Sequence, residues 1–264
     1  MPEDPAERQS IHEPEWVTNM VRAEPRVPLM GPYMAYLLLM MFVTGLPEGA
    51  GYQHLGIVLH IGGATWATWL LRHHWPALGQ SHFGLALIVG ILGAWLWVAG
   101  QHGLSGVEIG GYALGDRLSL GLDAPFLRLV PIEVVDVSHR FATPWAFWTH
   151  VILKITRAIT IVPIVEELFW RGFILRAFVN WNHFESVPIG RLTWFAFLGS
   201  SLLSVLQHPG NWGVSILCWM LFNALFYWKK SLRCLMITHG VTNLALYGYV
   251  VWTHLNGHGD WQFW

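Results

Sequence analysis

The sequence predicts an all-α membrane protein, a polytopic bundle of about seven transmembrane helices with its active site within the bundle. Hydrophobic residues make up 54% of the 264 residues and charged residues only 12%, whereas soluble domains carry roughly 25% charged residues. Long apolar segments also follow one another along the chain, and each bilayer crossing needs about 20 mostly apolar residues. The formal net charge of −1 gives nucleic acid binding no electrostatic support. The composition and the apolar segments instead predict that the lipid bilayer surrounds the protein.

The first 30 residues are predicted to form a disordered, acidic and proline-rich arm. Prolines and acidic side chains dominate residues 1–30, and the apolar pattern of the following chain is missing there. An acidic start without an apolar region directly behind it is not typical of a signal peptide. We therefore divide the chain into this arm, residues 1–30, and a transmembrane domain, residues 31–264.

Six apolar segments have lengths suited to membrane-spanning helices. They cover residues 31–47, 53–71, 83–100, 191–207, 212–228 and 232–252. A seventh, residues 145–180, is too long for one perpendicular crossing, because about 36 helical residues extend roughly 54 Å. Pro163 is expected to kink it. Its first half carries His150, Lys154 and Arg157 on one polar stripe, which suits the headgroup interface. A glycine-rich polar loop, residues 101–144, precedes it.

The basic residues predict an orientation with the amino end in the cytoplasm. In that orientation nine Lys and Arg residues fall on the inner side and three on the outer side, as the positive-inside rule requires. The inner residues are Arg8, Arg22, Arg26, Arg72, Arg176, Arg191, Lys229, Lys230 and Arg233, and the outer ones are Arg117, Arg128 and Arg140.

Few ionisable residues lie inside the apolar segments, and this narrows the chemistry. All Asp residues lie outside the expected spans, which excludes an intramembrane aspartate dyad; they are Asp4, Asp116, Asp123, Asp136 and Asp260. The zinc-protease pattern HExxH and the serine pattern GxSxG are absent. The hexapeptide Glu166-Glu167-Leu168-Phe169-Trp170-Arg171 remains, and such charges are costly in a membrane.

Within this hexapeptide the two carboxylates have different expected surroundings. Glu167 and Arg171 stand at i, i+4, the spacing of a helical ion pair. Glu166 lies about 140° from Arg171 around the helix, and an unpaired carboxylate inside the bundle is suited to act as a general base. The alternative interpretation is an ion pair that joins two helices, with Glu166 at an aqueous edge.

Two further groups of residues complete the candidate site. His208 ends one apolar segment just before Pro209, where a lone histidine is more often only an interfacial side chain. His239 and Asn243 share a face at i, i+4 within another segment. Both can donate hydrogen bonds to an oxyanion, and both can instead form an interhelical hydrogen bond.

Together these residues resemble the CPBP family, also called Abi, of CAAX-type and bacteriocin-processing intramembrane proteases, which carries EExxxR, FxxxH and HxxxN on successive helices. The first motif is complete as Glu166, Glu167 and Arg171, and the third as His239 and Asn243. The second contains His208 but has Ser204 where phenylalanine is usual. The resemblance covers residues 145–252. Residues 169–172 and 259–264 are also similar to the bacterial CAAX prenyl protease-related branch linked to exosortase and PEP-CTERM sorting.

The resemblance implies roles for these residues. Glu166 and His208 would activate a water, His239 and Asn243 would be oxyanion donors, and Glu167 and Arg171 would support the site. It also implies a glutamate-dependent mechanism without a cofactor. Zinc remains the alternative, since Glu166, His208 and His239 would supply the three protein ligands of a catalytic zinc site.

The sequence therefore predicts an intramembrane endopeptidase that hydrolyses a peptide bond in a membrane-anchored protein or a C-terminal tail. The expected location is a bacterial inner membrane, which a multi-pass protein would span, and an exosortase-type sorting system is an expected partner. A non-catalytic assembly partner of a sorting enzyme is the alternative, favoured only by Ser204. A transporter with Glu166 as proton relay is disfavoured, because no repeated half is visible.

Overall fold

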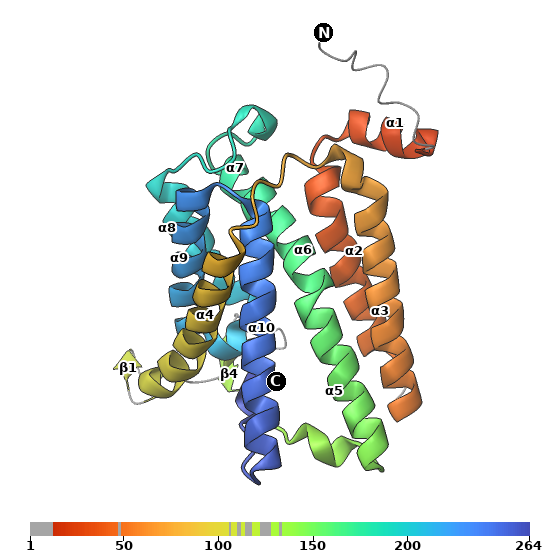
Figure 1. Ribbon diagram of the computed structural model, residues 1–264, viewed down its shortest axis with the longest axis vertical. Coiled ribbons are helices and arrows are strands. Elements are labelled where there is room, and N and C mark those ends of the chain that lie inside the picture. The colour runs from red at the N-terminus through yellow and green to blue at the C-terminus, as the bar shows by residue number, and fades with distance from the viewer. Residues whose placement is uncertain are drawn as a thin grey trace.

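The computed structural model describes residues 13–46, 49–105, 107–109, 112–113, 118–121, 128–131 and 134–264. In this part of the chain the dominant architecture is a bundle of helices, as the sequence predicts (Figure 1). Each of the predicted apolar segments forms helix. The helices are α2 (Val27–Thr44), α3 (Ala50–Leu71), α4 (Phe83–Leu104), α5 (Pro144–Ile159), α6 (Ile161–Glu167), α7 (Leu175–Ala177), α8 (Trp194–Gln207), α9 (Trp212–Lys229) and α10 (Leu232–Leu255).

Three of these helices, α2, α4 and α10, are long and apolar enough to cross a membrane by length and composition. Helix α8 is apolar but shorter. Helix α10 packs against α4, α5, α6 and α9, so it lies at the centre of the bundle (Figure 1). Helices α2 and α3 pair on one side, and α8 and α9 pair on the other.

The N-terminal arm is shorter than predicted, because residues 15–23 form helix α1 (Glu15–Ala23) and α2 begins at Val27. One face of α1 is apolar, and Val17 on it is fully buried. The Glu13 carboxylate also lies 2.8 Å from Nε2 of His74, which follows α3. These contacts tie the segment to the bundle despite its prolines. Residues 1–12 lie outside the described residues.

The described residues of the loop between α4 and α5 form four short strands that the glycine pattern does not predict. Strand β1 (Glu108–Ile109) pairs antiparallel with β2 (Tyr112–Ala113), and β3 (Leu118–Gly121) pairs antiparallel with β4 (Arg128–Pro131). Strands β1 and β4 and the C-terminus lie towards the opposite end of the bundle from α1 and α7 (Figure 1).

Candidate active site

The predicted long helix is interrupted between α5 and α6. Thr160 leaves helical geometry there, with φ −107° and ψ −80°, just ahead of the predicted kink at Pro163. Proline has no N–H to donate to the carbonyl of Ile159. Asn243 on α10 stabilises the break, because its Nδ2 donates to the carbonyl oxygen of Ala158 at 2.8 Å. Helix α5 therefore ends at Ile159 and α6 begins at Ile161, and α10 contacts both helices.

The Glu167–Arg171 ion pair predicted from the spacing is confirmed. Arg171 Nη1 lies 3.2 Å from Glu167 Oε1, and both side chains are fully buried. Arg171 belongs to a π-helical segment, Leu168–Ile174, that continues α6. Its Nε donates to Oδ1 of Asn223 on α9 at 3.1 Å. The ion pair thus ties the α6 segment to a neighbouring helix.

Glu167 also contacts His239 on α10. The distance from His239 Nδ1 to Glu167 Oε1 is 2.9 Å. A carboxylate paired with a guanidinium is ionised and only accepts hydrogen bonds, so Nδ1 is the donor in this contact. The other ring nitrogen, Nε2, lies 3.9 Å from Oε2 of Glu166. Glu167 therefore orients the His239 ring towards the second carboxylate.

Glu166 is only 6% exposed, and its Oε2 accepts no hydrogen bond within the part of the chain described. The side chain of Gln207, at the end of α8, interacts with the Glu166 carboxylate. The Gln207 carbonyl oxygen is occupied, because Trp170 Nε1 donates to it at 2.7 Å. This fixes the Gln207 amide so that its N–H groups are the ones left for Glu166.

His208 and His239 meet at a cavity of about 180 Å³, which Asn243 also lines. The His208 ring packs edge-on against Trp97 and Trp219, with ring centroids 5.1 and 5.5 Å apart. The structure therefore brings three of the four predicted catalytic residues to one cavity. Glu166 does not line it directly and reaches it through His239.

Sequence reasoning missed Gln207, Trp170 and Asn223. Asn223 offered a signal, since a polar amide inside an apolar helix usually has a partner; its Nδ2 donates to Ser200 and Ser201 on α8. Ser204, where the family pattern has phenylalanine, fits the same polar seam. Its Oγ lies 3.1 Å from Oγ of Ser215 on α9, so the small residue packs between these helices.

The residues do not fit the zinc alternative. Within the ranges that the structure describes, no group of three or more His, Cys, Asp or Glu side chains is arranged to hold a metal ion. Glu166, His208 and His239 do not form such a group.

The helical bundle, its apolar helices and the buried carboxylate–histidine cluster define a class, a helical membrane protein with a polar site inside the bundle. Residues 148–245 match the family model described as type II CAAX prenyl endopeptidase Rce1-like. The matched segment includes all three motifs of the predicted site. Neither the curated proteins nor the solved structures contain a match.

Proposed function

We propose that this protein is an intramembrane endopeptidase that hydrolyses a peptide bond in a membrane-anchored protein or a C-terminal tail without a metal. One observation carries the proposal. Glu166 has a buried, unpartnered carboxylate oxygen that faces His239 Nε2 at 3.9 Å, and His239 is held from behind by Glu167. A general base beside a histidine donor that a third group orients is an arrangement that hydrolases use.

The net charge of the buried cluster depends on whether His239 carries a second proton. Glu166 and Glu167 with Arg171 carry a net charge of −1, and a proton on His239 makes these four groups neutral together. A neutral cluster is favoured in an apolar bundle, where an uncompensated charge is costly. In that state Nε2–H of His239 is a donor, as the oxyanion role requires.

The proposed reaction follows from these positions. Glu166, with His208 at the cavity wall, takes a proton from a water, whose oxygen attacks the peptide carbonyl. His239 and the second N–H of Asn243 donate to the oxyanion. The C–N bond then breaks, and the proton held by Glu166 passes to the leaving amine. Gln207 keeps the Glu166 carboxylate in position through its amide.

The proposed location is a bacterial inner membrane, with several crossings. The cavity lies between apolar helices, so a substrate has to be anchored in the bilayer to reach it. A protein with a C-terminal sorting tail or a lipidated tail meets this condition. An exosortase-type sorting system is the proposed partner, because such a system handles proteins with C-terminal tails.

The test compares three strains, which express the wild-type protein, express the Glu166→Gln variant, or carry a deletion of the protein. Terminal-peptide proteomics is applied to their membrane and surface fractions. Glu185→Gln is the matched control, since Glu185 is exposed on the loop after α7. We expect specific proteins to keep uncut C-terminal tails in the Glu166→Gln and deletion strains, and normal termini with Glu185→Gln.

Two outcomes would contradict the proposal. Identical termini in all strains would exclude a proteolytic role. A change in the deletion strain alone would mean that Glu166 is structural and that the protein acts as a non-catalytic assembly partner.

A further inference from the structure

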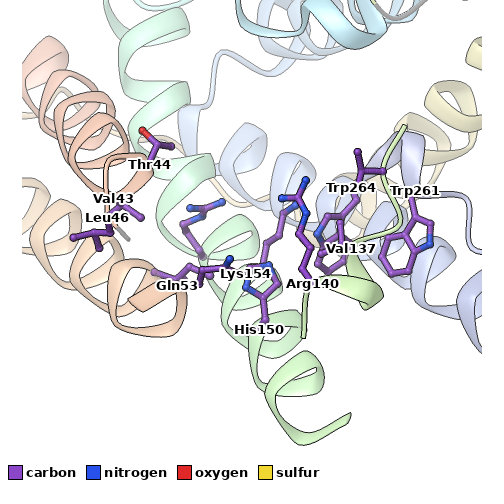
Figure 2. A pocket seen from close by; sticks show the side chains of 13 residues that line it. Val43, Thr44, Leu46, Gln53, Val137, Arg140, His150, Lys154, Trp261 and Trp264 are labelled. Carbon is purple, nitrogen blue, oxygen red and sulfur yellow. The ribbon is translucent and has the colours of Figure 1, made fainter. Parts of the chain in front are cut away.

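A second, larger cleft of about 510 Å³ lies between the α2–α3 corner, α5 and the C-terminal tryptophans. Figure 2 shows Lys154 and Arg140 in its middle, between the α2–α3 corner on one side and Trp264 and Trp261 on the other. Arg157 lines it as well. The reaction proposed above uses none of these side chains, so the basic cleft needs an explanation of its own.

The three basic side chains have no acidic partner in the described part of the chain. No Asp or Glu there lines the cleft, and none of Arg140, Lys154 and Arg157 forms an ion pair there. Lys154 Nζ instead lies 4.2 Å from the centre of the Trp264 ring. Charges that are held away from water without a counterion are costly, so an anion bound in the cleft would lower this cost.

Hydrogen-bond donors in the cleft also lack acceptors. Arg157 Nη1 donates to Nδ1 of His60 at 3.2 Å, which can accept because His60 Nε2 donates to the Tyr36 carbonyl oxygen. Arg157 Nε is buried and has no hydrogen-bond partner among the described residues, and the same holds for Nδ1 of His150. Guanidinium N–H groups are always donors, and buried polar atoms are nearly always paired. Arg157 Nε therefore indicates an acceptor from a ligand, to which His150 can donate as well.

The position of the cleft along α2 favours a ligand from the membrane. Helix α2 is long and apolar enough to cross a bilayer by length and composition, so its end at Thr44 is expected at a membrane surface. Thr44 and Leu46 line the cleft, and tryptophans such as the two in its wall are typical of the same headgroup level. Met41 and Phe42, just before the cleft, are 68% and 60% exposed. Lipid acyl chains would cover such side chains while the headgroup reaches the cations.

The chemistry of the ligand follows from the walls of the cleft. A phosphodiester carries one negative charge and offers free oxygens that a guanidinium binds well, and basic pockets between membrane helices bind anionic lipid headgroups in this way. Val43 and Ile57 add an apolar wall. The described residues lining the cleft include no carboxylate for the ammonium of a zwitterionic headgroup. The three cations therefore favour a lipid with a net negative charge.

We propose that the basic cleft binds the headgroup phosphate of an anionic glycerophospholipid, with Lys154 and Arg157 as its main contacts. The inference goes beyond the proposed function and does not depend on it. The lipid lies beside the α5–α6 break, because Arg157 directly precedes Ala158, whose carbonyl oxygen accepts from Asn243. Bound lipid therefore stabilises the segment that leads into the candidate site. Inorganic phosphate offers the same acceptor oxygens, and the experiment separates the two sources.

The experiment places the purified protein in nanodiscs that contain equal amounts of phosphatidylglycerol and phosphatidylethanolamine with identical acyl chains. Native mass spectrometry then counts the lipids that stay bound after release into a mild detergent. We expect wild type to retain phosphatidylglycerol about tenfold more than phosphatidylethanolamine, the magnitude of a hydrogen bond to a charged group. Lys154→Gln and, separately, Arg157→Gln should reduce this ratio towards one. An excess of inorganic phosphate should leave the lipid bound, because free phosphate lacks acyl chains.

Lys229→Gln is the matched control, since Lys229 also lies over a tryptophan, Trp228, at 3.6 Å but outside the cleft. It should keep the tenfold ratio. The comparison of the two lipids in wild type needs no variant, so a misfolded variant does not remove the test. As a second measurement, phosphatidylglycerol should raise the unfolding temperature of wild type in detergent more than phosphatidylethanolamine does, because a ligand that binds only the folded state stabilises it.

Three results overturn the inference. Equal retention of both lipids by wild type refutes a site for an anionic headgroup. An equal loss of phosphatidylglycerol in Lys154→Gln and Lys229→Gln means that the lipids bind through general charge and not in the cleft. Displacement of phosphatidylglycerol by inorganic phosphate, with equal stabilisation by phosphate alone, assigns the cleft to a soluble phosphate. Each result leaves the proposed protease function standing, because that function is read from protein termini.

Discussion

Glu167 holds two site residues at once, since its Oε1 contacts both Arg171 and His239. Glu167→Gln removes the charge that compensates the fully buried Arg171. Breaking one side of a buried ion pair typically costs about 3–5 kcal/mol, so we expect a clear loss of thermal stability in detergent, measured by intrinsic tryptophan fluorescence. Glu166→Gln is the control and should unfold close to wild type, because a neutral His239 then keeps the cluster neutral and the closest ion-pair distance of Glu166 is 3.9 Å. Equal unfolding temperatures for the two variants would contradict the assigned roles.

Metal removal is a second test at the residue scale. The residues around His239 provide no group of three ligands in the described part of the chain, so prolonged dialysis against a strong chelator should leave peptide cleavage unchanged. Activity is measured on a randomised library of N-terminally palmitoylated peptides before and after dialysis. Complete loss of cleavage that zinc alone restores would mean that Glu166, His208 and His239 rearrange to bind it.

The sequence predicts contacts within a helix better than contacts between helices. The Glu167–Arg171 pair follows from i, i+4 spacing alone, because both partners lie on one helical segment. The contact between His239 and Glu167 joins residues 72 positions apart. It depends on how α10 packs against α6, and no local pattern contains that register. For the same reason the interaction of Gln207 with Glu166 could not be predicted.

At the scale of elements, the crossing of α10 over the α5–α6 break depends on Gly240. A Cβ on Gly240 would lie 3.0 Å from the carbonyl oxygen of Ile159, which is backbone and cannot move aside alone. We expect Gly240→Ala to push α10 away from the break, which weakens the Asn243 contact with Ala158 and lowers both stability and cleavage. Unfolding temperature and library cleavage are the measurements.

Gly248 on the same helix is the matched control, because nothing lies within 4 Å of a Cβ there. Gly248→Ala should be neutral or stabilise by up to about 1 kcal/mol, the difference in helix propensity. If both variants behave alike, the close crossing at Gly240 has no energetic importance.

Local sequence patterns predict some boundaries of the helices and miss others. Hydropathy locates the helical segments, and Pro163 predicts an interruption, because it removes a helix donor. The exact place of the break, Thr160, depends on Asn243 and Gly240 of α10. Helix α1 could not be predicted from the local sequence, because prolines and acidic residues surround it. Its burial against the bundle depends on tertiary contacts, which no local pattern contains.

At the scale of the whole molecule, the bundle places successive connections at alternate ends. Residues 72–82, 178–193 and 230–231 connect helices at the end where α1 and α7 lie, and the C-terminus lies at the other end (Figure 1). The excess of Lys and Arg at the first end, among them Arg72, Arg191 and Lys230, predicts that this end is cytoplasmic.

This orientation can be tested with two single cysteines, Asn182→Cys after α7 and Asn256→Cys after α10, both at exposed positions. The native Cys218 and Cys234 are buried, so they form an unreactive background. With a membrane-impermeant maleimide on spheroplasts, we expect Asn256→Cys to label directly and Asn182→Cys to label only after permeabilisation. The reverse pattern would invert the orientation. Labelling of both cysteines from one side would contradict the three crossings, α8, α9 and α10, that we infer between residues 182 and 256.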